Sequence, residues 1–328
     1  MKTIQEKQGN KVWNFYFPSR KNLNVAGALM LHLILFTSCL DPHLETVADI
    51  EESFAGITTI EVDAGFLPAE YVGDPDLEEV TLDALLRSNA GGSKDISYRV
   101  VGEKLTVTLE NNGLGWGRSE GHILLSGPPN MSLQMHSGSG EVHAENVMGD
   151  KIHLEVNSGR IHAKNLTALE IYLSASSGKV MGENIKGNTL AEVSSGKLSI
   201  QQLDGNLDAE SSSGNMEFKG VNGLLNAKLS SGNINMEQVQ ALGKVTLSSG
   251  NVKGRGIGLS EHSFLKASSG NISVQTNSNL AAFNYEIHTG SGRAKVGESE
   301  SSGTLIIMNG SPHTIKGEVS SGKIEIFN

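Results

Sequence analysis

Hydrophobic residues alternate with polar ones in short runs along most of the chain, and a Ser-Gly pair separates the runs. The stretch "SSGKLSIQ" is typical, because apolar Leu198 and Ile200 alternate with polar Lys197, Ser199 and Gln201. Alternation with a period of two is the pattern of a β-strand that buries one face. The sequence therefore predicts β-strands that are interrupted by turns at the Ser-Gly pairs.

The Ser-Gly pair recurs at nearly constant spacing. Successive marker glycines are 19, 19, 18, 18, 18, 18, 20, 22 and 30 residues apart, and the last interval contains an additional "SSG" at 301–303. A fixed period of this length indicates a repeat architecture. The ten marker glycines are Gly140, Gly159, Gly178, Gly196, Gly214, Gly232, Gly250, Gly270, Gly292 and Gly322.

Apolar residues form columns at fixed offsets from the marker glycine: two, four and seven residues after it, and three and five residues before it. A coil of about 18 residues cannot bury such a face alone, but stacked coils can. We therefore expect an all-β fold, a single-stranded parallel β-helix (β-solenoid) with about 18–20 residues per coil. The column two residues after the marker reads Val142, Ile161, Val180, Leu198, Met216, Ile234, Val252, Ile272, Ala294 and Ile324.

The pattern assigns residues 56–328 to the β-helix, with regular coils at 133–328. Residues 56–132 contain strand-like runs separated by turns such as "GDPD" and "NNGLGWG". We expect them to form irregular N-terminal coils and a cap that uses Phe66 and Trp116; a separate small β-domain is the alternative. The C-terminal cap is expected around Pro312 and the final "KIEIFN", because an open solenoid end would promote aggregation.

Composition agrees with a thin, ladder-based core. The chain has 328 residues, 39 glycines, 5% aromatic residues and no proline between Pro129 and Pro312. Its formal net charge is −10, which argues against a nucleic-acid partner, because binding to phosphates requires a basic surface.

Residues 1–38 have the features of a targeting segment. Basic residues precede the apolar run "VAGALMLHLILF" at 25–36, which is too short to span a bilayer and resembles the core of a signal peptide. The run ends at "FTSC", and Cys39 is the one cysteine of the chain. This arrangement resembles a bacterial lipobox, which implies cleavage before Cys39 and its lipidation; an uncleaved anchor is the alternative. Residues 39–55 are predicted to be an acidic tether.

The marker serines do not have the pattern of a catalytic nucleophile. A hydrolase uses one serine beside a base, whereas here a serine precedes all ten marker glycines. A turn explains the repeat better, because glycine permits positive φ at a corner. The residue after the marker is asparagine in four consecutive coils, which predicts a hydrogen-bonded ladder of Asn215, Asn233, Asn251 and Asn271.

Two other outward columns are candidates for binding. Arg160, Lys179 and Lys197 form a short basic stripe that could hold an anionic headgroup or glycan, or could simply be solvated. His143 and His162 fall at the same offset, so they should stack about 4.8 Å apart, and they are weak candidates for a metal site. No other metal site, catalytic residue or cofactor is predicted, because calcium-repeat, phosphate-loop, dinucleotide-binding and zinc motifs are missing from the sequence.

The repeated "SSGxIxI" strands after a lipobox resemble the bacterial putative-adhesin family, a β-strand-repeat domain of unknown function related to head-domain adhesins of the GIN type. The segments "FNYEIHTGSGRAKVG" and "EVSSGKIEIF" carry the resemblance most clearly. It implies a right-handed β-helix on the cell envelope, at the outer membrane in a Gram-negative cell, and it supplies no catalytic residues.

We therefore expect a non-enzymatic protein, anchored to the membrane through lipid on Cys39, that acts as an adhesin or envelope scaffold with a glycan, cell-wall or protein ligand. An envelope-stress sensor or regulatory partner is the first alternative. A carbohydrate-active enzyme on a β-helix is the second.

Overall fold

The computed structural model describes residues 43–113 and 117–328. Residues 44–328 form one compact unit, which is described below. The predicted signal segment, Cys39 and Trp116 lie outside the described residues. In the part of the chain that the structure describes, no helix is long and apolar enough to cross a membrane; the one helix there is a single 3-10 turn, η1 (Leu280–Ala282).

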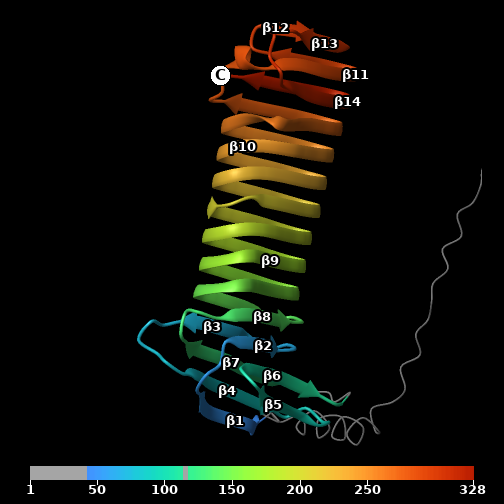
Figure 1. The fold of residues 1–328 in the computed structure, drawn as a ribbon. Coiled ribbons are helices and arrows are strands. Elements are labelled where there is room, and N and C mark those ends of the chain that lie inside the picture. Colours follow the sequence, from blue (N-terminus) through green and yellow to red (C-terminus); the bar gives the residue numbers. More distant parts are fainter. Residues whose placement is uncertain (1–42, 114–116) are drawn as a thin grey trace, which may run out of the picture. The chain divides into compact units, whose positions relative to one another are not determined.

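The compact unit is all-β (Figure 1). Within the described residues, fourteen strands form one continuous sheet. They are β1 (Glu45–Phe54), β2 (Thr59–Asp63), β3 (Ala69–Gly73), β4 (Val80–Ser88), β5 (Lys94–Val101), β6 (Lys104–Asn111), β7 (Ser119–Gly127), β8 (Ser132–Ser137), β9 (Glu141–Asp204), β10 (Leu207–Thr276), β11 (Asn284–Val296), β12 (Ser299–Ser301), β13 (Thr304–Ile307) and β14 (Thr314–Phe327).

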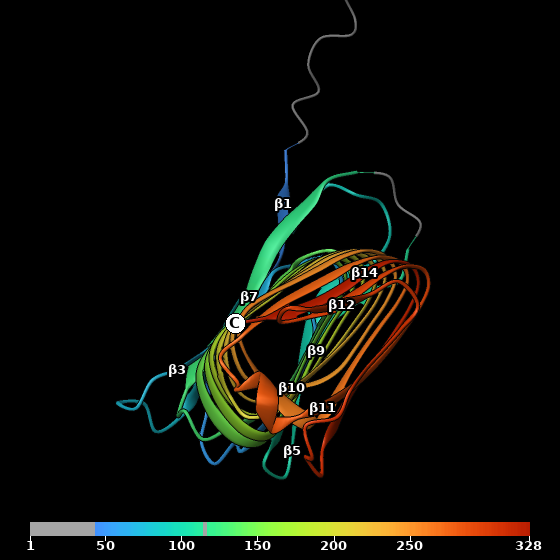
Figure 2. The ribbon, with the colours of Figure 1, turned by 90° about the horizontal axis from the view of Figure 1, so that it is seen from above.

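The long elements β9 and β10 each run through several turns of a parallel solenoid. β10 pairs in parallel with β9 so that Gly214 lies beside Gly196 and Phe218 beside Ile200. Each residue therefore has its counterpart one repeat earlier as its neighbour. Seen from above, the coils follow nearly the same flattened outline (Figure 2). The periodicity of the sequence thus becomes the register of the sheet.

The apolar columns line the interior, as the sequence predicts. Every residue of the column two positions after the marker is at most 1% exposed. A further buried column, seven residues before the marker, was not recognised from the sequence because polar Thr189 and Ser263 and the residue Gly243 interrupt it. Its apolar members include Leu133, Ile152, Ile171, Leu207, Leu225, Tyr285 and Ile315.

The N-terminal end differs from the predicted order of coils. The first coil, β2 and β3, lies between two later ones: β2 pairs with β6 and β8, and β3 pairs with β7 and β9, all in parallel. Antiparallel β4 and β5 then continue the sheet beyond β7 and β6. Residues 56–132 therefore belong to the same sheet as the regular coils, and they do not form a unit of their own.

The prediction of a tether at 39–55 is wrong for residues 45–54. These residues form β1, which pairs antiparallel with β4 over its whole length. Although its sequence is acidic, Ala48 is buried, and Ile50 and Phe54 pack against the core. The Phe54 ring meets Tyr98 of β5 edge to face, with the ring centroids 5.4 Å apart, so this pair links the two strands. Phe66 instead packs beside the core in the β2–β3 turn.

The predicted C-terminal cap is also wrong. The final strand β14 pairs in parallel with β10 on one side and with β11 on the other, so it is an interior strand. The outer edge is covered by β12 and β13, which fold back antiparallel onto β11 (Figure 1). This order is possible because β11 and β14 carry the same Ser-Gly marker, and either can continue the ladder.

Candidate functional site

The marker glycines form a stacked column at one corner of the solenoid. A Cβ added to Gly232 would overlap the carbonyl oxygen of Gly214, and the same holds at each neighbouring marker up to Gly322 on Gly270. Gly232 also has φ +132°, in the region that favours glycine. Glycine is therefore required at the marker position, because the backbone of the neighbouring coil leaves no room for a Cβ. The serine before it recurs because every coil repeats the same corner.

Asparagine side chains form hydrogen-bonded ladders at this corner and at the next. Asn233, Asn251 and Asn271 each donate from Nδ2 to Oδ1 of the asparagine one coil earlier, over 3.2–3.3 Å. A second ladder, which was not predicted, links Asn184 to Asn165 and Asn165 to Asn146 over 2.7 and 2.8 Å. Its members have φ between 54° and 59°, so they mark a second corner six residues after the glycine. The signal in the sequence is a column of Asn, Gln and Gly at that offset.

The two candidate metal ligands are stacked but engaged with carboxylates. The rings of His143 and His162 are 6.1 Å apart and tilted. His162 lies 3.1 Å from Glu141, and His143 lies 3.4 Å from Glu145. Burial lowers the pKa of the His162 imidazole. Across residues 43–113 and 117–328, no group of three or more His, Cys, Asp or Glu side chains is placed to hold a metal ion.

The predicted basic stripe ends beside a groove in the surface. Lys197, its last member, pairs with Glu217 over 2.7 Å. Glu217 lines a groove of about 840 Å³ that runs across the coils on the outward face of the strand after the marker. The groove was not predicted, because its lining residues differ from coil to coil and share only their offset.

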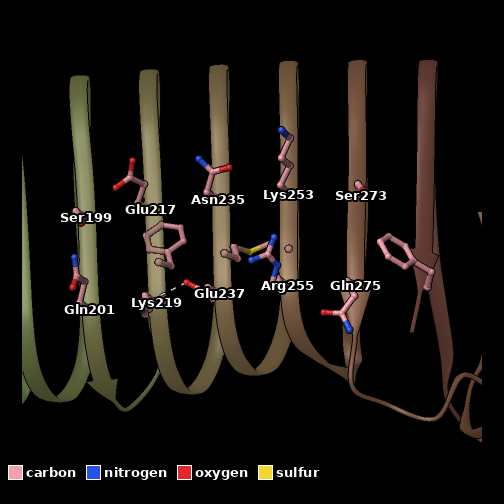
Figure 3. A pocket seen from close by; sticks show the side chains of 14 residues that line it. Ser199, Gln201, Glu217, Lys219, Asn235, Glu237, Lys253, Arg255, Ser273 and Gln275 are labelled. Atoms are coloured by element: carbon pink, nitrogen blue, oxygen red, sulfur yellow. Dashed lines mark ion pairs between the residues drawn. The ribbon is translucent and has the colours of Figure 1, made fainter.

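Two rows of outward side chains line the groove, three and five residues after each marker (Figure 3). One row is Ser199, Glu217, Asn235, Lys253 and Ser273; the other is Gln201, Lys219, Glu237, Arg255 and Gln275. The alternation of the strand sends these residues outward while their neighbours enter the core. Phe327 of β14, the ladder partner of Gln275, lines the end of the groove.

The charges in the groove are unevenly satisfied. Lys219 lies 3.8 Å from Glu237, and Glu217 is held by Lys197. Lys253 and Arg255, by contrast, are exposed and form no ion pair with any residue that the structure describes. They lie on one coil with Gly254 between them, so both can reach the same ligand. The groove therefore presents two free cations among amides and hydroxyls.

Comparisons with known proteins add a family and several solved structures. A putative cell adhesion protein from Clostridium sporogenes shares 12% identity over 85% of this chain and 99% of its own, with a TM-score of 0.28. Putative adhesins from Parabacteroides distasonis and Parabacteroides merdae share 15% and 10% identity over 85% and 86% of this chain and 96% of their own, with TM-scores of 0.36 and 0.31.

No curated protein matches the chain. The family model described as Toastrack DUF4097 matches residues 73–326, which include the regular coils up to Ile326 and every groove residue named above except Phe327. The chain therefore belongs to the Toastrack DUF4097 family.

Proposed function

We propose that this protein is a non-enzymatic, lipid-anchored β-solenoid of the cell envelope that binds an acidic polysaccharide along its groove, as an adhesin or scaffold. The observation that carries the proposal is the pair of free cations, Lys253 and Arg255, in the groove of an otherwise acidic chain. A guanidinium and an ammonium on one strand favour carboxylate or sulfate groups.

The repeat of the solenoid favours an extended polymer. Successive coils present outward side chains at the same two offsets about every 4.8 Å along the groove. A chain of sugar units can therefore lie across several coils and meet Gln201, Asn235 and Gln275 in turn. Amide groups both donate and accept hydrogen bonds, so they suit sugar hydroxyls.

The carboxylates of the groove support binding over hydrolysis. Glycosidases use a pair of carboxyl groups, one of which must hold a proton. Glu217 and Glu237 each form an ion pair with a lysine, at 2.7 and 3.8 Å, so both carboxylates are already engaged.

Envelope location and the lipid anchor rest on the sequence. The apolar run at 25–36 and Cys39 support export and lipidation. A right-handed sense of the coil is part of the same proposal.

The groove is tested with residues 44–328, which form a compact unit, and polygalacturonate as the acidic polymer. The double variant K253Q/R255Q should weaken binding about tenfold or more, since each charge-assisted hydrogen bond contributes on the order of 1.5–3 kcal/mol before screening. Added salt should weaken binding of the parent protein.

The matched control is K186Q/K316Q, which removes the same charge from two exposed lysines outside the groove. The control should bind like the parent, and neutral dextran should bind to none of the proteins. If both double variants lost the same affinity for polygalacturonate, the effect would come from net charge alone. This result would refute binding in the groove.

The anchor is tested separately with the full chain in a bacterial host. Replacing Cys39 by Ala should abolish labelling with a fatty-acid analogue and move the protein out of the detergent-soluble membrane fraction. A C39A protein that keeps its label contradicts lipidation at this residue.

A further inference from the structure

A second hollow of about 710 Å³ lies on the outward face of the other strand of each coil, before the marker. Its lining includes Lys151, His153, Glu155, Glu170, Tyr172 and Asp208. The inward sides of both strands face the core, so this hollow and the groove lie on different faces of the solenoid. The two sites share no lining residue.

An aromatic and aliphatic platform forms the floor of this hollow. The rings of His153 and Tyr172 meet edge to face, with centroids 4.6 Å apart at 90°. The Tyr172 hydroxyl donates to Glu192 over 2.7 Å, which holds the ring in place. Leu190 occupies the same offset one coil later and remains 38% exposed. The half-buried Tyr172 ring and the exposed Leu190 side chain together offer apolar surface to the apolar face of a sugar ring.

The rim of the hollow is acidic. Three carboxylates line it, those of Glu155, Glu170 and Asp208, against one lysine, Lys151. Glu170 is exposed and has no ion-pair partner among the described residues. Asp208 is the ladder partner of Leu190, so it stands directly beyond the platform. A ligand on the platform therefore meets negative charge at the platform's side and at its end.

His153 does not offset this charge. Its Nε2 atom is buried without a hydrogen-bond partner and lies 3.6 Å from Glu155. Burial lowers the pKa of the imidazole, so it is mainly neutral near pH 7. The ring contributes apolar surface to the platform and leaves the acidic rim uncompensated.

We propose that this hollow binds a protonated amino sugar, with the sugar ring on Tyr172 and Leu190 and the ammonium group directed to Glu170 and Asp208. Cations are attracted to the faces of aromatic rings, and carboxylates beside the ring add to this attraction. The site is opposite in charge preference to the groove, lies on another face and does not depend on the function proposed for the groove.

The test is calorimetry on residues 44–328 with two probes, the glucosamine tetrasaccharide and its fully N-acetylated form. Acetylation removes the charge and keeps the ring, so the glucosamine form should bind at least about tenfold more tightly. Glu170→Gln should remove most of this preference, and Tyr172→Leu should weaken binding of the glucosamine form.

The variants are checked for unchanged thermal unfolding, and Glu170→Gln is the safer of the two because its side chain is exposed and unpaired. Glu183→Gln is the matched control, because Glu183 is exposed and lies outside both the hollow and the groove, and it should bind glucosamine like the parent. Equal affinity for the two probes, or full binding by Glu170→Gln, would overturn the proposal. If polygalacturonate does not bind, the function proposed for the groove fails, and the amino-sugar proposal for the hollow is unaffected.

Discussion

Gly322 stacks directly on Gly270, and a Cβ on Gly322 would overlap the carbonyl oxygen of Gly270. The complete strand β11 lies between them in the sequence but not in space. The contact between these two glycines indicates that coils stack where their marker glycines can pack backbone to backbone. Neighbouring coils need not be consecutive in the sequence.

We predict that Gly232→Ala destabilises the solenoid by about 3 kcal/mol or more, because the methyl group meets the backbone of Gly214 and the φ of +132° is strained for alanine. Gly303→Ala is the matched control. Gly303 has φ +127° but no heavy atom within 4 Å of an added Cβ, so only the conformational cost of about 1–2 kcal/mol applies. Urea unfolding measures both, and equal losses would contradict a role for close approach.

The asparagine ladder predicts an effect that depends on position. Asn233 donates to Asn215 and accepts from Asn251, so Asn233→Ser breaks two side-chain hydrogen bonds. Asn271→Ser breaks the one bond to Asn251. With about 0.5–1 kcal/mol for each bond, the first change should cost about twice the second in unfolding free energy. A larger loss at Asn271 would show that the ladder does not contribute in this way.

Hydrogen exchange tests the placement of the C-terminal strand. The amides of β14 should be protected as well as those of β10, because β14 is paired on both sides. The amides of β12 should exchange faster, since this strand pairs only with β11. Mass spectrometry of peptides covering 299–301 and 314–327 separates the two. Rapid exchange throughout β14 would instead indicate a frayed terminus.

The stability of the protein should fall as the pH is lowered through about 6.5, in part because of His153. Burial lowers the pKa of His153 below 6.5, so the unfolded chain binds the proton more readily than the folded one. The stabilisation from neutral His153 is therefore fully present above the pKa of His153 in the unfolded chain. It is lost as the pH falls from that value through the lower pKa of the folded protein. The lowered pKa of His162 acts in the same direction.

His153→Gln should make the unfolding free energy less dependent on pH between about 7.5 and about 5.5. Urea titrations at several pH values measure the slope, and NMR titration of the imidazole gives the folded pKa directly. An unchanged slope in the variant would exclude His153 as a source of the effect.

The regular part of the fold could be predicted because each coil repeats the same solution. Val193 and Leu198 are apolar at offsets where every coil must fill the core, so the columns appear in the sequence. The order of the end coils could not be predicted in this way. β11 and β14 present the same Ser-Gly corner and apolar columns, and the periodicity is satisfied by either order. The 30-residue interval between Gly292 and Gly322 was the one local sign of an irregular end.

Binding features were less visible than structural ones. Lys253 and Arg255 are ordinary outward residues in the sequence, and only the stacking of the coils brings Asn235 and Gln275 to either side of them. Likewise, His153 and Tyr172 are separated by a whole coil, and their contact requires the register of the sheet.

The pairing at the two ends of the solenoid determines where the solenoid can gain or lose a coil. The first coil, β2 and β3, and the last strand, β14, are each paired on both sides with other parts of the chain. Each end of the solenoid is therefore closed by several segments together. Between them, every interior coil offers the same upper and lower surface. A duplication or loss of one 18-residue coil among the regular coils would lengthen or shorten the solenoid by about 4.8 Å. Both closed ends would stay intact. The length of the solenoid can therefore vary in steps of one coil without a new fold.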